Sequence, residues 1–250
     1  MGSLRGKRAL VTAGAQGIGL AVSRALLAEG CRVAVHYFSS AGTANELKAE
    51  FGDRVCAVQA DLTDPVQVET LVKQTIEFLG GLDVLVNNAG SLIGRRLLED
   101  VDTAFWTQVV DVNVTSMMNV TRCAAPALCA AAGASIINLA SLAGRKGGHP
   151  GSLVYSTAKG AVLTFTRALS AELGPKGVRV NALAPGLILE TRFHTTHTTQ
   201  ESAEATIAQI PLGRAGHPDD VARAAVFLAE QFDGFITGAT LDINGGVYCA

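Results

Sequence analysis

A tyrosine and a lysine one helical turn apart are the residues of this sequence best suited to proton transfer. Tyr155 and Lys159 begin a stretch whose apolar residues follow helical spacing, so both side chains project from one face. A phenol is a poor base near neutral pH because its ordinary pKa is about 10. A neighbouring ammonium group would lower that pKa. The pair therefore predicts a proton donor and acceptor for a carbonyl or an alcohol, although an ordinary tyrosine beside a solvated lysine would have the same spacing.

A glycine-rich turn near the N-terminus is suited to holding a phosphate group. It reads Thr12-Ala13-Gly14-Ala15-Gln16-Gly17-Ile18-Gly19 and lies between the first predicted strand and the first predicted helix. Glycines let the backbone approach a pyrophosphate closely, and the helix N-terminus offers free N–H groups and a positive dipole end. Tight turns need glycine in any case, but this position is the one that the dinucleotide-binding fingerprint requires. We therefore predict dinucleotide binding at this turn.

Short apolar runs alternate with longer helical patterns along the chain. The predicted strands are Arg8–Thr12, Arg32–His36, Val55–Gln59, Val84–Asn87, Ser135–Leu139, Arg179–Leu183 and Thr240–Ile243. The predicted helices lie near Gly17–Glu29, Ala41–Phe51, Pro65–Phe78, Thr103–Ala131, Tyr155–Leu173 and Pro218–Phe232. Strands without in-and-out alternation are typical of a sheet covered on both faces, and strand–helix alternation favours right-handed βαβ units.

This alternation predicts an α/β fold in one domain over residues 1–250. We expect a Rossmann-type doubly wound parallel sheet of about seven strands with helices on both faces. The segment Pro185–Pro218 is long and irregular, and is expected to be a mobile substrate lid with a short helix inside.

Composition excludes several classes of protein. The 250 residues are 48% hydrophobic and 17% charged, which is enough to form a core and argues against disorder. A net charge of −2 argues against a nucleic-acid partner. The longest weakly polar run, Cys123–Ala134, is too short to cross a membrane, and no apolar leader precedes Gly14. Five cysteines without CxxC spacing predict neither disulfides nor a metal site, so a cytoplasmic setting is expected.

Several motifs in a fixed order resemble the classical short-chain dehydrogenase/reductase family over nearly the whole chain. They are the glycine-rich turn, Asp61-Leu62, Asn87-Asn88-Ala89-Gly90, Asn113, Ser141, Tyr155 with Lys159, Pro185-Gly186 and Asn244-Gly245-Gly246. Within the family the chain most resembles the 3-oxoacyl-carrier-protein reductase-like group and the sugar or alcohol dehydrogenases. The resemblance implies an oxidoreductase that interconverts a ketone and a secondary alcohol by hydride transfer with a nicotinamide cofactor.

The resemblance also implies roles for individual residues. Tyr155 would be the general acid and base, and Lys159 would hold the nicotinamide ribose and lower the tyrosine's pKa. Ser141 would hydrogen-bond the substrate oxygen, and Asn113 would support a water molecule in a proton relay. Asp61 and Leu62 would flank the adenine, Asn88, Ala89 and Gly90 would line a ribose, and Ile188 would face the carboxamide of the nicotinamide. The other implied cofactor contacts are Gly14, Gln16, Gly17, Ile18, Gly19, Tyr155, Lys159, Pro185, Gly186 and Thr191.

The sequence departs from the family pattern at three points. Ala13 stands where the family has its first loop glycine. Ser141 and Tyr155 are 14 positions apart, one more than is usual, and the loop Gly147–Gly151 is expected to take up the extra residue. The threonine after Pro185-Gly186 arrives one residue late, as Thr191, preceded by Glu190.

The end of the second strand favours NADP(H) over NAD(H). Relatives that prefer NAD usually carry an acid there to bind the ribose 2′-OH. This chain has His36, followed by Tyr37, Phe38, Ser39 and Ser40. No carboxylate would repel a 2′-phosphate and two hydroxyls could donate to it. The arginine or lysine that commonly holds the phosphate is absent, however, because Gln16 and Phe38 occupy those positions.

The expected substrate is a small ketone, a sugar-derived compound or a coenzyme-linked compound. An acidic carrier protein would need basic residues at the entrance, and residues 124–135 contain none, although Arg145, Lys146 and Lys176 lie elsewhere. His149 and Phe193 are candidate substrate contacts. A 3-oxoacyl-[acyl-carrier-protein] reductase, a non-catalytic nucleotide-binding regulator and another Rossmann-type enzyme such as a methyltransferase remain alternatives.

Some remaining features concern the surface. Small apolar residues on Thr103–Ala131 and Tyr155–Leu173 favour close packing across a two-fold axis, and family members are usually tetramers, so we expect a homotetramer or a dimer. Trp106 is expected in the core or in an interface. Arg95 and Arg96 are interpreted as a solvated pair, and His194 and His197, although spaced as HxxH, are not expected to bind a metal.

Overall fold

All strands of the sheet run parallel, as predicted. The computed structural model describes residues 4–230 and 234–249, apart from the side chains at positions 192 and 193. Over these residues the sheet has seven strands in the order β3-β2-β1-β4-β5-β6-β7. Their bounds are β1 Arg8–Val11, β2 Arg32–Tyr37, β3 Val55–Gln59, β4 Val84–Asn87, β5 Ser135–Leu139, β6 Arg179–Pro185 and β7 Thr240–Ile243. The order reverses between β1 and β4, which is where doubly wound sheets bind ligands.

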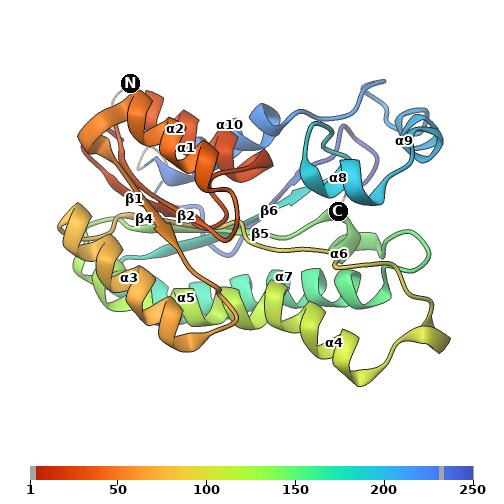
Figure 1. Cartoon of the computed structure of the whole chain (residues 1–250), viewed down its shortest axis with the longest axis horizontal. Helices are drawn as coiled ribbons and strands as arrows, with labels where there is room; N and C mark the ends of the chain where they lie inside the picture. Colours follow the sequence, from red (N-terminus) through yellow and green to blue (C-terminus); the bar gives the residue numbers. More distant parts are fainter. Residues whose placement is uncertain (1–3, 231–233, 250) are drawn as a thin grey trace.

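Helices cover both faces of the sheet (Figure 1). One face carries α1 Gly17–Ala28, α2 Ala41–Phe51 and α10 Pro218–Ala229, and the other carries α3 Pro65–Leu79, α5 Ser116–Ala130 and α7 Leu153–Leu173. Strand β1 shows why its residues do not alternate in polarity. Ala9 and Val11 pack into the core on the α1 side, Leu10 packs into the core on the α3 side, and all three are fully buried.

The long helix predicted over Thr103–Ala131 is interrupted. It consists of α4 Thr103–Val110, a π-helical turn Asp111–Thr115 and α5. Its apolar spacing continues through the break because one turn of wider helix shifts the pattern by only one residue. At the other end of the chain, α10 ends at Ala229, and the predicted end at Phe232 lies outside the described residues.

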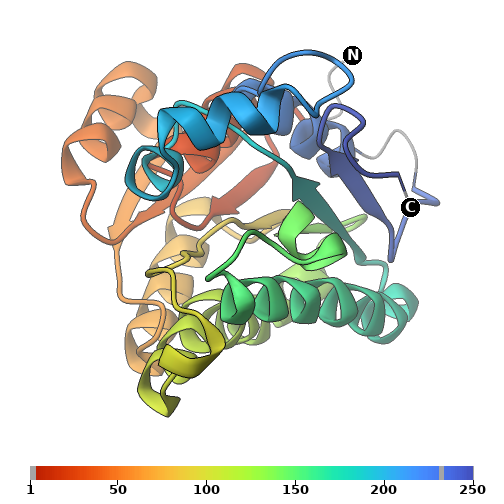
Figure 2. The same ribbon diagram turned by 90° about the vertical axis from the view of Figure 1, so that its right-hand side faces the viewer.

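Short helices border the carboxyl edge of the sheet. The irregular segment after β6 contains two of them, α8 Arg192–His197 and α9 Gln200–Ile207, where one was expected. A further helix, α6 Leu142–Lys146, was not predicted. Figure 2 shows α9 on one side of this edge, with α6 and the start of α7 on the other. The short 3-10 turns are Gly52–Arg54, Leu98–Asp100 and Gly174–Lys176.

None of the helices in the described ranges combines the length and the apolar character needed to cross a bilayer.

Candidate active site

A cavity of about 510 Å³ opens where β1, β4, β5 and β6 end. Thirteen residues expected to take part in catalysis or binding line it: Gln16, Gly17, Ile18, Asn88, Gly90, Ser141, His149, Tyr155, Lys159, Pro185, Gly186, Ile188 and Thr191. They come from the segments that follow the strands and from the first turns of α1 and α7. Parallel strands bring these distant segments to one edge of the sheet.

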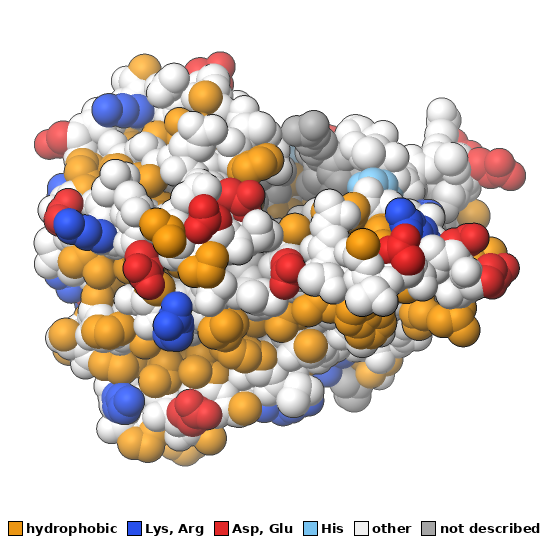
Figure 3. Space-filling model, turned by 60° about the horizontal axis from the view of Figure 1, so that its bottom comes forward, with side chains coloured by type: hydrophobic (Ala, Val, Ile, Leu, Met, Phe, Trp, Pro, Cys, Tyr) orange, Lys and Arg blue, Asp and Glu red, His pale blue; other side chains and the backbone are white. Residues whose placement is uncertain are grey.

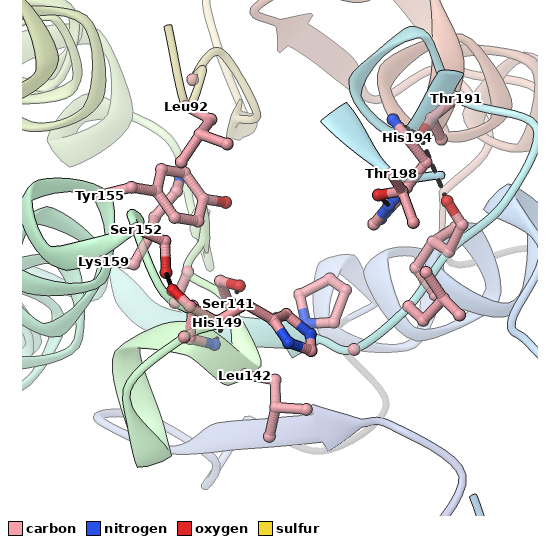
Figure 4. A pocket seen from close by; sticks show the side chains of 18 of the residues that line it. Leu92, Ser141, Leu142, His149, Ser152, Tyr155, Lys159, Thr191, His194 and Thr198 are labelled. Carbon is pink, nitrogen blue, oxygen red and sulfur yellow. Dashed lines mark hydrogen bonds between the residues drawn. The ribbon is translucent and has the colours of Figure 1, made fainter. Parts of the chain in front are cut away.

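Ser141, Tyr155 and Lys159 lie together on one side of the cavity (Figure 4). Ser141 directly precedes α6, and its Oγ accepts a hydrogen bond from the Ala143 N–H at 3.1 Å. The same hydroxyl group hydrogen-bonds the Tyr155 side chain. Lys159 is only 3% exposed, and its Nζ donates to the Leu139 carbonyl oxygen at 2.7 Å. The lysine is therefore fixed between α7 and the end of β5, with its Nζ 5.8 Å from the centroid of the Tyr155 ring.

Burial shifts the pKa values of Tyr155 and Lys159 in opposite directions. It raises the pKa of Tyr155 to about 12, although the hydrogen bond with Ser141 acts to lower it. Burial also lowers the pKa of Lys159 to about 8. The sequence predicted that the lysine would lower the tyrosine's pKa, but in this structure burial is the largest cause of the shift and the opposing cause is Ser141, not Lys159. Tyr155 therefore keeps its proton at neutral pH, which is the form that can donate to a carbonyl oxygen.

The glycine-rich turn forms the part of the cavity that could hold phosphates. Gly17 has a φ of +48°, and a Cβ at Gly19 would overlap the Ala13 carbonyl oxygen, so neither position accepts a larger residue without strain. The N-cap residue of α1, Gln16, makes no capping hydrogen bond with its side chain. Gly17 and Ile18, the first residues of α1, line the cavity, and the unpaired N–H groups of a first helical turn are suited to an anion. These features fit the diphosphate of a dinucleotide.

Ala13, which replaces a family glycine, takes a left-handed conformation with a φ of +49°. A non-glycine residue there costs about 1 kcal/mol. A partly buried hydrogen bond offsets this cost, because the Ala13 N–H donates to His36 Nδ1 at 2.9 Å. The other ring nitrogen of His36, Nε2, lies 3.0 Å from the Ala60 carbonyl oxygen and so carries the proton.

His36 was expected at the cofactor, but it supports the turn from behind. Its side chain is 2% exposed, and both of its ring nitrogens are occupied by backbone groups. Burial lowers its pKa, which keeps the ring neutral and able to accept from Ala13. Strand β2 extends to Tyr37, one residue beyond the predicted end, and this places His36 inside the sheet.

Asn88 and Thr12 join the turn to the end of β4. The Asn88 Nδ2 donates to the carbonyl oxygens of Thr12 at 3.0 Å and Ala13 at 3.3 Å. Thr12 Oγ1 accepts from the N–H groups of Asn88 and Ala89 at 2.8 and 3.0 Å. The Asn88 side chain therefore fixes the glycine-rich turn, and Asn88 also lines the cavity.

Asn113 lies in the π-helical turn and holds the segment after β4. Its side-chain oxygen accepts from the Ser91 N–H at 3.1 Å, and its Nδ2 donates to the carbonyl oxygens of Ser91 and Val109 at 2.7 and 2.9 Å. The side chain is 1% exposed and does not line the cavity. Its predicted part in a water relay stays a prediction, and its visible role is to position Ser91.

The late threonine reaches the cavity because Glu190 absorbs the extra residue. Glu190 takes a left-handed conformation with a φ of +59°, and its carboxylate lies 3.1 Å from His217 Nε2, away from the cavity. Thr191 then turns back, caps α8 and lies against Gly17. Thr191 Oγ1 also donates to the Ile188 carbonyl oxygen at 3.2 Å.

Other expected cofactor residues lie outside the cavity. They are Gly14, Gly19, His36, Phe38, Ser39, Ser40, Asp61, Leu62 and Ala89. Phe38 is 63% exposed at the end of β2, and Ser40 Oγ donates to Gln16 Oε1 at 3.0 Å. Asp61 accepts from the hydroxyl group of Thr63 at 2.7 Å. The Phe193 side chain lies outside the described residues, so its expected substrate contact stays a prediction.

Sequence reasoning missed several lining residues. Arg95, Leu92, Ser152, His194 and Thr198 border the cavity. Arg95 was interpreted as solvated, and it is exposed at the mouth of the cavity. No local pattern indicated these positions, because they meet only when α8 and the loop 147–151 fold over the sheet edge.

Comparisons with known proteins agree with this geometry. Residues 12–248 match the family model described as Enoyl-(Acyl carrier protein) reductase. A 3-oxoacyl-[acyl-carrier-protein] reductase of Staphylococcus aureus is 37% identical over 97% of this chain and 98% of its own. An NADH-dependent reductase responsible for alginate metabolism has a TM-score of 0.91 and 32% identity over 100% of both chains. A short-chain dehydrogenase of Burkholderia cenocepacia in complex with NADP has a TM-score of 0.90 and 33% identity over 98% and 99% of the chains.

The chain belongs to the short-chain dehydrogenase/reductase family. It is an NAD(P)-dependent dehydrogenase or reductase, which confirms the resemblance and sets aside the methyltransferase alternative.

Because burial raises its pKa, Tyr155 should stay a phenol at pH values above the ordinary tyrosine pKa of about 10. In the protein labelled with ¹³C at tyrosine Cζ, the resonance that disappears in Tyr155→Phe should keep its phenol position up to pH 10.5 without cofactor. The reason is a pKa of about 12. A midpoint below pH 10 would contradict the burial argument.

Proposed function

We propose that the protein interconverts a ketone and a secondary alcohol with NADP(H), using Ser141, Tyr155 and Lys159. The observation that carries the proposal is the half-buried Tyr155, whose side chain hydrogen-bonds Ser141 in the same cavity as the N-terminus of α1. When bound, the nicotinamide would supply or accept the hydride.

The protein's own residues would manage the proton. Tyr155 would donate its phenolic proton to the carbonyl oxygen during reduction and take it back during oxidation. Ser141 would hydrogen-bond the same oxygen and orient it. Lys159 would hold the cofactor ribose, and its ammonium charge would favour the phenolate left on Tyr155. Asn88, Gly90, Pro185, Gly186, Ile188 and Thr191 would position the nicotinamide half of the cofactor.

Small ketones, sugar-derived compounds or coenzyme-linked compounds are favoured over a carrier-bound acyl chain. Of the three basic residues that the sequence suggested for a carrier protein, Arg145 is held by Asp242 at 3.0 Å. Lys176 lies in the turn before β6, at the opposite edge of the sheet from the cavity. Only Lys146 of the three borders the mouth. A 3-oxoacyl-[acyl-carrier-protein] reductase remains the second candidate, because a relative with 97% coverage of this chain bears that name.

Replacement of Tyr155 tests the reaction. Tyr155→Phe should lower kcat by roughly 10³-fold or more, because general acid catalysis typically contributes 10²–10⁴-fold. The affinity for NADPH, measured by fluorescence titration, should change less than about threefold. Tyr37→Phe, on a side chain outside the cavity, is the matched control. An unchanged kcat in Tyr155→Phe would leave a non-catalytic, nucleotide-binding role as the better account.

The β2 end supports a preference for NADP(H). No acid follows β2 before α2, and Ser39 and Ser40 offer hydroxyl groups there. An acid at this point would repel a 2′-phosphate and bind the 2′-OH of NAD, so its absence removes the main determinant of NAD binding. We expect a higher kcat/KM with NADPH than with NADH in steady-state assays of one ketone. A tenfold advantage for NADH would reverse this assignment.

We also propose a homotetramer, assembled in part through the α4–α5 face. Hydrophobic side chains gather in a band across the side shown in Figure 3. Trp106 on α4 is 41% exposed and so is not a core residue, and Met118 on α5 and Leu153 at the start of α7 are 37% and 45% exposed. Large apolar side chains on one face are typical of subunit contacts. Light scattering should give four subunits, or two, and Trp106→Glu should dissociate them. A monomeric wild type would contradict the proposal.

We propose a cytoplasmic setting because the cysteines show neither a disulfide nor CxxC spacing. All five cysteines are free thiols, which suits a reducing compartment.

A further inference from the structure

The mouth of the cavity carries basic side chains without acidic neighbours. Arg95, Lys146, His149 and His194 line it in addition to the catalytic Lys159. Across the residues that the structure describes, no aspartate or glutamate lines this cavity. Figure 4 shows His149 beside Ser141, and His194 with Thr198 across the cavity from Tyr155. The basic groups therefore surround the space that a substrate would occupy.

Acidic residues are present nearby but face elsewhere. Helix α9 contributes Ser202 and Thr206 to the lining, which are one turn apart on one face of the helix. Glu201 and Glu204 of the same helix do not line the cavity, and Glu204 accepts from Gln200 Nε2 at 2.9 Å. Glu190, just before α8, pairs with His217. The segment over the cavity thus keeps its negative charges outside.

Arg95 is the strongest cation of this group. Its Nη1 donates to the Pro150 carbonyl oxygen at 3.3 Å and its Nη2 to the His197 carbonyl oxygen at 3.4 Å. Both partners are neutral, and no carboxylate pairs with Arg95 in the described parts of the chain. A guanidinium has five N–H donors in a planar fork that matches a carboxylate or a phosphate, so donors remain for a ligand.

The neighbouring arginine shows the contrast. Arg96 pairs with Asp102 at 2.9 Å and lies over the Phe105 ring, 4.3 Å from its centroid. It does not line the cavity. The two adjacent arginines therefore differ in their partners. Arg96 pairs with the carboxylate that caps α4, whereas Arg95 hydrogen-bonds carbonyl oxygens at the mouth.

Neighbouring positive charges also lower the pKa values of two histidines, His194 and His197, near the mouth. Burial lowers the pKa of His194 to about 4, and the charges of His197, Arg95 and His149 lower it further. Arg95 also acts, after burial, to lower the pKa of His197. The shift of His194 shows that positively charged or chargeable side chains lie close together at the mouth. An anion bound among them would reduce their electrostatic repulsion.

We infer that the substrate is a small ketone bearing a negatively charged group, a carboxylate or a phosphate, that Arg95 binds at the cavity mouth. The carbonyl of the same molecule would then face Ser141 and Tyr155. Lys146, the last residue of α6, adds to the attraction. This inference rests on the proposed function and names its substrate class.

Matched pairs of ketones test the inference. Acetoacetate is compared with its neutral methyl ester, and dihydroxyacetone phosphate with dihydroxyacetone, by following NADPH oxidation. Wild type should give a kcat/KM at least about tenfold higher for the charged member of one pair, and that pair identifies the anion as carboxylate or phosphate. Equal or better turnover of both neutral members would overturn the inference.

Arg95→Met should lower kcat/KM for the charged ketone by about tenfold or more, mainly through KM, and change the neutral ketone less than about threefold. Arg95→Lys should recover part of the loss, because it restores charge without the fork. Arg96→Met is the matched control and should change neither ketone. An equal loss for both members in Arg95→Met would mean that Arg95 only holds the two loops, and would overturn the inference.

Binding without turnover separates the two proposals. The Tyr155→Phe variant loaded with NADPH is titrated with each ketone by calorimetry. Preferential binding of a charged ketone that wild type does not reduce would uphold the anion site and reject the proposed reaction. Binding of neither charged ketone, or equal affinity within both pairs, would overturn the anion site and leave the proposed reaction to its own test.

Discussion

Parallel strand pairing is the constraint on which this structure depends. Because β1, β4, β5 and β6 run in one direction, the segments that follow them leave the sheet at a single edge. Buried amides fix these strands to the helices on one side. Asn87 Nδ2 donates to Asn138 Oδ1 at 2.9 Å across β4 and β5, and Asn138 Nδ2 donates to Thr166 Oγ1 on α7 at 3.0 Å. The helix that carries Tyr155 is therefore placed by the strand that precedes Ser141.

Burial then decides the chemistry at that edge. Lys159 is enclosed and tied to the Leu139 carbonyl oxygen, so its position depends on β5 and not on solvent. The pKa of Tyr155 is raised and that of Lys159 lowered, both by burial. A neutral phenol is the form that can donate a proton to a carbonyl oxygen, and the charged form of Lys159 would favour the phenolate that remains. The charge of an oxidised cofactor would favour the opposite direction.

The two ends of the cavity differ in the kind of element that forms them. The end that holds Tyr155 and Lys159 is formed by the sheet edge and by α7, whose parts are held by buried hydrogen bonds. The mouth is formed by loops and short helices, which change more readily between relatives than the elements that they connect. Arg95 joins two of these loops by hydrogen bonds to Pro150 and His197. This division would let the mouth define the substrate while the end at the sheet edge stays constant.

Local sequence determined the seven strands, the phosphate turn and the Tyr155–Lys159 pair, because each depends on residues within one or two turns of the chain. Short-range pattern also placed Ser141 and Asn88 at strand ends. It did not show that His36 supports the glycine-rich turn from inside β2. The reason is that His36 and its hydrogen-bond partner Ala13 belong to different elements. The pattern also did not show that Arg95, which is exposed as expected, lines the cavity. It missed the break in the helix predicted over Thr103–Ala131, since apolar spacing does not register one wider turn. Only the tertiary structure decided these, because burial and charge at each position come from segments that lie far away along the chain.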